Sequence, residues 1–231
     1  MDRPVTETGP GSMPADVPVD MEGDWLADSA SPLLQGETAR RVDDPNRPDR
    51  LAWNAFRTLA LWDADAWVPR LLEIAIGTGN LISALEWGGA TVAPWAAGME
   101  FDDVTDVVLD GPEAYVVAAC TLLPHPTEEH VRAAAMAALD GSLHGAREAG
   151  LIVVAPPGSE DLPGELERAG QLELHEGRTL GELLTDRVGW VSWPELGRLA
   201  LDLAEESDPG PEEQVRHLVS DLQNRFPDPN L

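Results

Sequence analysis

The chain has 231 residues, of which 43% are hydrophobic, and this is enough for one substantial domain with its own core. Its formal net charge of -27 argues against broad, non-specific binding to nucleic acid, because such binding depends on cationic side chains that displace counterions from phosphate. The sequence contains no lysine, which excludes phosphate-loop lysines, Schiff-base chemistry and lysine general bases.

Cysteine usage and hydropathy bear on the compartment. The single cysteine, Cys120, excludes an internal disulfide framework and a cysteine-rich zinc site. No stretch reaches the roughly 18 to 20 uninterrupted apolar residues that a membrane span needs, and the N-terminus lacks a signal-peptide pattern. We therefore expect a cytoplasmic protein without a membrane partner.

The N-terminal part of the chain differs in composition from the rest. Residues 1–44 are rich in Pro, Gly, Ser and Asp, and their scattered apolar residues follow neither a helical nor a strand period. This pattern predicts a disordered acidic tail in front of a single α/β domain over residues 45–231. Within the tail, residues 21–26 mix acidic and bulky apolar side chains, as short docking peptides do.

The domain begins with helical spacing of apolar residues. From Pro48 onward they recur three and four residues apart, and Pro48 and Asp49 suit the first turn of a helix. Asp63 or Asp65 can cap a second helix, which Gly77 ends. The buried stripes of these helices are predicted at Leu51, Ala55, Phe56 and Leu59, and at Trp67, Leu71, Leu72 and Ala75.

Three strands are expected next, after a loop over residues 78–89. The first is a short strand over 91–95. The other two form the clearest pair in the sequence, over 105–110 and 114–122, since both are rich in Val and Leu and a turn at 111–113 separates them. This pattern predicts a hairpin.

Helices and strands alternate in the rest of the chain. An Ala-rich helix that Thr127 opens is predicted to reach about Glu148, and the apolar strand 151–155 follows it, as in a βαβ crossover. Further elements are expected as a helix over 163–169, a strand over 188–191, and helices over 193–205 and 211–226. The order predicts an α/β fold with an α-β-β-β-α-β core, a mixed sheet flanked by helices, and C-terminal helices.

This order, together with the segments TDVVLDGPEAYVVAACTLL and VGWVSWPELGRLAL, resembles the PD-(D/E)XK nuclease superfamily across roughly residues 48–226. In that superfamily an Asp on one strand of the hairpin and a Glu-x-Lys on the next hold a divalent metal ion. The resemblance implies a nuclease-like fold and lets us ask which residues stand at those places here.

The residues at the corresponding places do not form a metal site. If the turn centres on Pro112, Asp106 faces Ala118 across the hairpin, and Cys120 shares the sheet face of Ala118. Ala118, Ala119 and Cys120 then replace Glu-x-Lys, so the second carboxylate and the cation are missing. One carboxylate is too little for Mg²⁺, which gives up its hydration water reluctantly. We expect a degenerate site without a metal or another cofactor.

Each of these positions also has a structural interpretation. Asp106 can close the start of the hairpin, while Ala118 and Cys120 can be small core residues. Glu73, on the second helix, is the candidate for the accessory acid that such folds often carry there, and it can equally be a solvated helix charge. A nucleophilic Cys120 would need a nearby base, and His125 lies beyond the strand end, beside two prolines.

The segment LLEIAIGTGN, residues 71–80, supports an alternative interpretation. It is similar to the glycine-rich loop of S-adenosylmethionine-dependent methyltransferases, in which an acid, here Glu73, precedes Gly77 and Gly79. In that family the glycines let the backbone approach the cofactor closely, so this alternative implies S-adenosylmethionine as a cofactor. Ala75 departs from the pattern, because it stands where the first glycine is usual.

Arginines gather where the tail meets the domain, and they are the candidate patch for contact with phosphate. These residues are Arg40, Arg41, Arg47, Arg50 and Arg57. Ion pairs with carboxylates on the surface of the same domain are the alternative.

The leading functional hypothesis is a catalytically degenerate nuclease-fold protein that acts as a binding or assembly subunit for a protein complex. Nucleic acid is then reached only through the local arginine patch. The alternatives are a methyltransferase-like enzyme that uses S-adenosylmethionine and an acidic structural or regulatory interaction protein. The amphipathic C-terminal helix can pack on the domain or on a second copy of the chain, so a homo-oligomer is a further option.

Overall fold

The computed structural model describes residues 48–94, 104–124, 126–159, 162–171, 173–175, 177–207, 210–228 and 231. The predicted tail over residues 1–44 lies outside the described residues, and so does His125. In the part of the chain that is described, no helix has the length and apolar character that crossing a bilayer requires.

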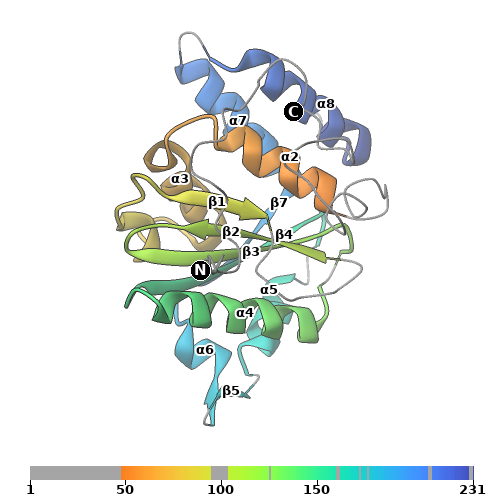
Figure 1. The fold of residues 1–231 in the computed structure, drawn as a ribbon. Coiled ribbons are helices and arrows are strands. Elements are labelled where there is room, and N and C mark those ends of the chain that lie inside the picture. Colours follow the sequence, from red (N-terminus) through yellow and green to blue (C-terminus); the bar gives the residue numbers. More distant parts are fainter. Residues whose placement is uncertain are drawn as a thin grey trace, which may run out of the picture.

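A mixed five-stranded sheet forms the centre of the described structure (Figure 1). Its strands, in spatial order, are β1 (Thr91–Pro94), β2 (Val104–Asp110), β3 (Ala114–Thr121), β4 (Glu148–Ala155) and β7 (Val188–Ser192). The first three strands pair antiparallel, and β3, β4 and β7 pair parallel. The predicted mixed sheet in an α/β fold is therefore confirmed, as is the hairpin.

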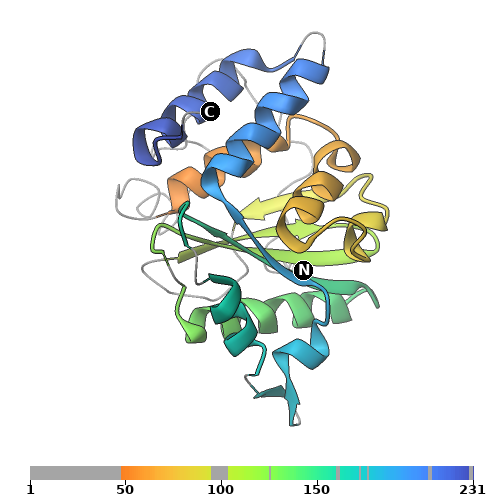
Figure 2. The ribbon, with the colours of Figure 1, turned by 180° about the vertical axis from the view of Figure 1, so that it is seen from behind.

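Helices cover both faces of this sheet. The longer ones are α2 (Asp49–Leu59), α3 (Ala64–Ile76), α4 (Glu128–Leu143), α7 (Trp193–Glu206) and α8 (Glu212–Arg225). The shorter ones are η1 (Ile82–Ala84), α5 (Leu162–Ala169) and α6 (Leu180–Leu183), and a separate ribbon consists of β5 (Glu173–His175) and β6 (Arg178–Thr179). Figure 2 shows β7 along one edge of the sheet, where it leads directly into α7.

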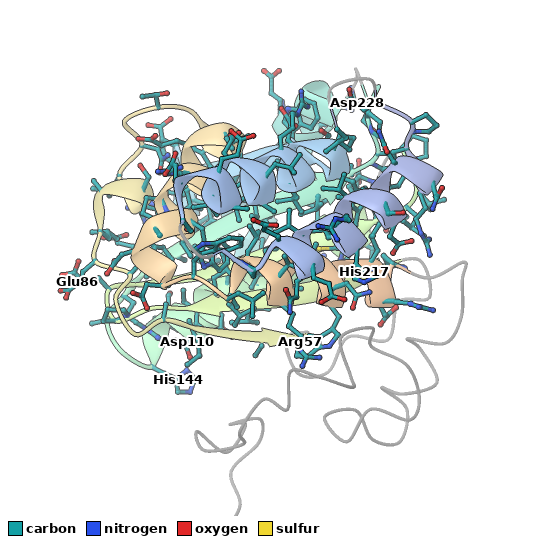
Figure 3. The ribbon with its side chains drawn as sticks, turned by 90° about the horizontal axis from the view of Figure 1, so that it is seen from above. Arg57, Glu86, Asp110, His144, His217 and Asp228 are labelled. Atoms are coloured by element: carbon teal, nitrogen blue, oxygen red, sulfur yellow. The ribbon has the colours of Figure 1, made fainter. Side chains whose placement is uncertain are left out.

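Alternation along the strands separates two apolar cores. One face, which includes Val116, Ala118 and Cys120, packs against α2, α3, α7 and α8. The opposite face, which includes Val117 and Ala119, packs against α4 and the region of α5 and α6. Figure 3 shows the first helical layer from above, with α7 and α8 side by side. Successive strand residues point to opposite faces, so a shift of one residue moves a side chain into the other core.

Local sequence signals explain where several helices begin. The Thr127 side chain accepts a hydrogen bond from the His130 backbone N–H and so caps α4. Ser192 and Glu195 form a capping box at the start of α7. The Trp193 indole N–H then donates to the Thr121 carbonyl oxygen over 2.8 Å, which ties α7 to the end of β3.

The predicted boundary between the long helix and the next strand is wrong. α4 ends at Leu143 rather than near Glu148, and β4 already begins at Glu148. The intervening turn includes Ala146 with a positive φ of 51°. Gly150 does not stop the helix: it lies inside β4, where a Cβ atom would be 2.7 Å from Ile82 Cδ1. Close packing between η1 and the strand accounts for this glycine.

Four short elements are absent from the sequence-based expectation. They are η1, which lies within the predicted 78–89 loop, and the run formed by β5, β6 and α6. A signal for α6 is present in the sequence, because Thr179 and Glu182 form a capping box of the S/T-x-x-E type. The helix has only four residues, too few to show an apolar period.

Candidate functional site

The hairpin register differs by one residue from the prediction. Asp106 pairs with Ala119, not with Ala118. The reason is the turn: the Gly111 N–H donates to the Ala114 carbonyl oxygen, so two residues rather than three connect the paired positions. This shift places Asp106 on the sheet face that packs against α4, because directly paired residues share a face.

On that face Asp106 contacts a histidine. The His130 Nε2 atom, on α4, lies 3.1 Å from Asp106 Oδ1, and the side chains are only 1% and 3% exposed. A carboxylate oxygen accepts hydrogen bonds, and the tautomer of His130 that carries its proton on Nε2 supplies the matching donor. No local pattern in the sequence indicates this partner, because 24 residues separate the two. The carboxylate is thereby held inside the structure, where a substrate phosphate does not reach it.

The two replaced motif positions lie in the other core. Ala118 and Cys120 are fully buried among the apolar residues beneath α2, α3 and α7. Burial raises the pKa of the Cys120 thiol well above its ordinary value, and the negative charges of Asp106 and Asp49 add to this effect. A thiol that stays protonated and has no solvent access is a poor nucleophile, which is evidence against a catalytic Cys120.

The four positions implied by the nuclease resemblance do not meet in one cleft. Glu73 is exposed on α3, Asp106 faces α4, and Ala118 and Cys120 face the helices on the opposite side. Among the described residues, no group of three or more His, Cys, Asp or Glu side chains is arranged to hold a metal ion. At these four described positions the only carboxylates, Glu73 and Asp106, lie on different elements and do not come together as a pair of metal ligands.

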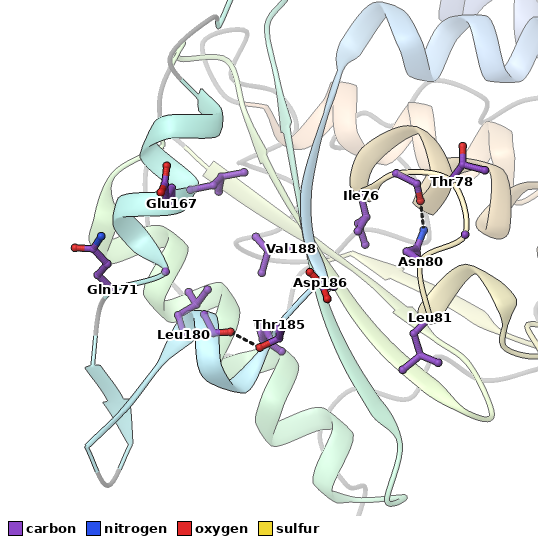
Figure 4. Close-up of a pocket in the computed structure, with 16 residues that line it drawn as sticks. Ile76, Thr78, Asn80, Leu81, Glu167, Gln171, Leu180, Thr185, Asp186 and Val188 are labelled. Carbon is purple, nitrogen blue, oxygen red and sulfur yellow. Dashed lines mark hydrogen bonds between the residues drawn. The ribbon is translucent and has the colours of Figure 1, made fainter.

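A groove of about 850 Å³ lies elsewhere on the molecule, at the edge of the sheet formed by β7. One wall is the segment 76–81, which leads from the end of α3 into η1, and the opposite wall comes from α5 and α6 (Figure 4). Asp186, in the turn before β7, and Val188, the first residue of β7, lie between the two walls. Its volume is typical of ligand sites.

Glycines and one asparagine shape the first wall. Gly77 and Gly79 have positive φ angles of 122° and 78°, which side chains rarely adopt. The Asn80 side chain fixes the turn, because its amide donates to the Leu72 and Gly77 carbonyl oxygens and its Oδ1 accepts from the Ser83 N–H. The wall is thus a rigid turn, not an extended loop.

The second wall forms where α5 and α6 meet. The Gly181 N–H donates to the Gly170 carbonyl oxygen over 2.8 Å, and a Cβ atom at 181 would be 3.0 Å from that oxygen. The Thr185 hydroxyl donates to the Gly181 carbonyl oxygen over 2.6 Å. These contacts explain why a helix of one turn is stable here.

Charge in the groove is of one sign. Glu167 and Asp186 line it, and none of its lining residues in the described chain is Arg or His. Both carboxylates lack an ion pair or hydrogen bond with any described residue. The neighbouring Arg187 binds Glu148 at 2.5 Å instead. The groove therefore combines aliphatic side chains with two carboxylates that no described residue pairs with.

The glycines of the methyltransferase-like segment do line this groove, whereas Glu73 does not. Residues 71–76 of the segment belong to helix α3, so its glycines follow a helix and not a strand. The groove lies at the amino ends of the parallel strands, since Val188 opens β7. In open α/β folds, nucleotide cofactors bind beyond the carboxyl ends of the strands. The geometry differs from that of the family that the segment resembles.

Only part of the arginine patch can be placed. Arg40, Arg41 and Arg47 lie outside the described residues. Arg50 and Arg57 are on α2, and the Arg57 guanidinium lies 6.0 Å from the centre of the Trp53 ring.

Comparison with protein-family models, with curated proteins and with solved structures finds no match to this chain. Function therefore has to be inferred from the residues and their geometry.

Proposed function

We propose that this protein is a non-catalytic binding or assembly subunit, built on a core like that of the PD-(D/E)XK nucleases, and that its partner is a protein. One observation carries the proposal: the Asp106 carboxylate is buried in contact with His130, on the opposite sheet face from Ala118 and Cys120. A metal-dependent nuclease needs its carboxylates together and open to phosphate. The described residues at the corresponding positions here lack that arrangement, which supports the proposal of a non-catalytic role.

The charge of the chain supports a protein partner over bulk nucleic acid. A net charge of -27 repels polyphosphate over distances set by the ionic strength. The same charge steers the approach of cationic protein surfaces and increases association rates at low salt. The compartment proposed for this function is the cytoplasm, where a reduced Cys120 is expected.

A nuclease assay tests the absence of catalysis. The purified protein is incubated with single- and double-stranded DNA and with RNA, in Mg²⁺ and in Mn²⁺, beside the Asp106→Ala variant. We expect no metal-dependent cleavage by either protein. Cleavage by the wild type that Asp106→Ala abolishes would refute the proposal.

Complex formation tests the binding role. A tagged form of the chain is expressed in the organism that encodes it, and the proteins that co-purify with it are identified. The complex is then reconstituted from separately purified components. We expect a stoichiometric complex by light scattering. A complex that persists at high salt would favour a purely structural role for the acidic chain, whereas one that dissociates indicates that charge contributes to the interface. If the protein remains monomeric, or forms only homo-oligomers, the proposal that it binds a different protein is contradicted.

The methyltransferase alternative is kept as a second candidate because Gly77 and Gly79 line the groove. It predicts saturable binding of S-adenosylmethionine, which calorimetry detects directly. We expect no binding at millimolar ligand, because Glu73 lies outside the groove lining. Saturable binding that is weakened by Gly79→Ala would establish the alternative instead.

A further inference from the structure

The groove beside β7 exposes aliphatic side chains on both of its walls. Leu81 is 51% exposed, and Ile76, Leu166 and Val188 are partly exposed. Leu184, beneath them, is buried. Apolar side chains gathered in a concave site favour a ligand that covers them, because removing apolar surface from water is favourable.

The polar groups of the groove select the charge of that ligand. Glu167 lies on the α5 side of the groove, and Asp186 lies in the turn before β7. Asn80 and Thr185 already use their side chains to hold the backbone of the walls. Thr78 and Gln171, which also line the groove, are neutral, so the charged acceptors for a ligand are the carboxylates of Glu167 and Asp186. Carboxylates pair best with guanidinium or ammonium groups.

The N-terminal segment of the chain itself is not complementary to the negative charge of the groove. Residues 1–47 carry ten acidic residues and four arginines, so their net charge has the same sign as the groove. Phosphates and acidic peptides are disfavoured for the same reason. Charge complementarity points to a different, basic chain.

We propose that the groove binds a segment of a partner protein in which aliphatic or aromatic residues stand next to Arg or Lys. The apolar side chains lie against Leu81, Ile76 and Val188, and the cations pair with Glu167 and Asp186. This proposal rests on the proposed function, since it assumes a protein partner, and it assigns the contact surface and the chemistry of that partner.

A random peptide library displayed on phage tests this choice, because the selection does not require the partner to be identified first. The library is selected on the full chain, and the enriched peptides are synthesised and measured by fluorescence anisotropy. We expect enriched sequences to combine Arg or Lys with large apolar residues. Enrichment of acidic or purely polar sequences, or no enrichment at all, would overturn the proposal.

Matched variants separate the groove from the general negative charge of the protein. E167Q with D186N removes the two groove carboxylates, and Asn tolerates the positive φ of 57° at position 186. D140N with E205Q removes the same charge from exposed positions of α4 and α7. We expect the groove pair to weaken peptide binding about fivefold more than the control pair does. Equal weakening would show that only net charge attracts the peptides and would overturn the proposal.

A second pair of variants tests the apolar contact. Leu81→Ser removes an exposed aliphatic side chain of the groove, and Leu143→Ser removes a 77% exposed one at the end of α4. We expect Leu81→Ser to weaken binding about tenfold and Leu143→Ser to leave it unchanged. If the two variants bind the peptide with the same affinity as each other, the proposal is overturned. Metal-dependent cleavage would refute the proposed function itself, whereas failed peptide selection in an inactive protein refutes only this surface.

Discussion

Gly189 of β7 lies directly against the Ala75 carbonyl group near the end of α3, where a Cβ atom would be 2.2 Å from the carbonyl oxygen. The neighbour is backbone and not a flexible side chain, so it cannot rotate away. This contact brings the end of α3, and with it the 76–81 wall of the groove, next to the edge strand. One glycine therefore connects the packing of the sheet with the shape of the groove.

Gly189→Ala is expected to destabilise the protein by about 2 to 3 kcal/mol, because the added methyl group forces two backbone segments apart. Urea unfolding followed by tryptophan fluorescence measures the loss. Gly164→Ala in α5 is the control, since the nearest atom there is Arg168 Nη1 at 3.7 Å, and Ala stabilises a helix relative to Gly. If Gly189→Ala left the free energy of unfolding unchanged, α3 and β7 would not be in this close contact.

The buried pair of Asp106 and His130 is expected to stabilise the fold. Asp106→Ala leaves a buried imidazole without its carboxylate and should cost about 3 kcal/mol, whereas Asp106→Asn keeps an acceptor and should cost about 1 kcal/mol. A double-mutant cycle with His130→Ala measures the coupling between the two side chains. Additive effects in this cycle would contradict the observed contact.

Cys120 is expected to resist thiol reagents in the native protein and to react fully once urea unfolds it. Burial raises its pKa, so folding favours the neutral thiol. This contribution to stability is complete below the ordinary pKa of a thiol, and it is lost as the pH rises toward the raised native value. Reaction with a colourimetric disulfide reagent measures access, and the stability difference from Cys120→Ala should fall at alkaline pH.

A cysteine at an exposed site is the control for that experiment. Ala84→Cys, placed in the Cys120→Ala background, puts the thiol at an exposed position of η1. It should react rapidly in the native state. Rapid reaction of native Cys120 itself would mean that the end of β3 opens to solvent.

The surface ion pair of Arg70 and Glu206 is expected to contribute much less to the free energy of unfolding than the buried pair of Asp106 and His130. Arg70 donates to both carboxylate oxygens, at 2.9 and 2.6 Å, which lowers the pKa of Glu206. The stabilisation is therefore present above the ordinary carboxyl pKa and is lost as the pH falls through the lowered value. Arg70→Ala should cost less than Asp106→Ala at neutral pH, and its effect should vanish in acid.

Local patterns are sufficient to predict most of the larger elements. The apolar spacing of α2 and α3, the Val- and Leu-rich hairpin and the capping residue Thr127 each correspond to an element in the structure. Short elements escape prediction, because α6 and the β5–β6 ribbon have too few residues to show a period. The predicted end of α4 is misplaced, because Gly150 has the sequence pattern of a helix stop although it serves close packing.

The candidate sites depend on information that spacing does not contain. A turn shorter by one residue moves Asp106 to the other face of the sheet and next to His130, a residue on a different element. The groove joins residues 76–81 with residues 166–188, far apart in sequence. Of the residues that line the groove, Gly77 and Gly79 are the ones that belong to a recognisable sequence motif. That motif suggests a cofactor-binding loop of the methyltransferase type and not a peptide-binding groove.

By itself, the sequence determined the class of the fold and the sign of the charge, because apolar period and net charge depend only on which residues stand near one another in the chain. Only the tertiary structure decided which core each strand residue enters and which carboxylates remain open to a ligand. Both depend on contacts between distant segments, such as Gly189 with Ala75, and those exist only once the sheet has formed.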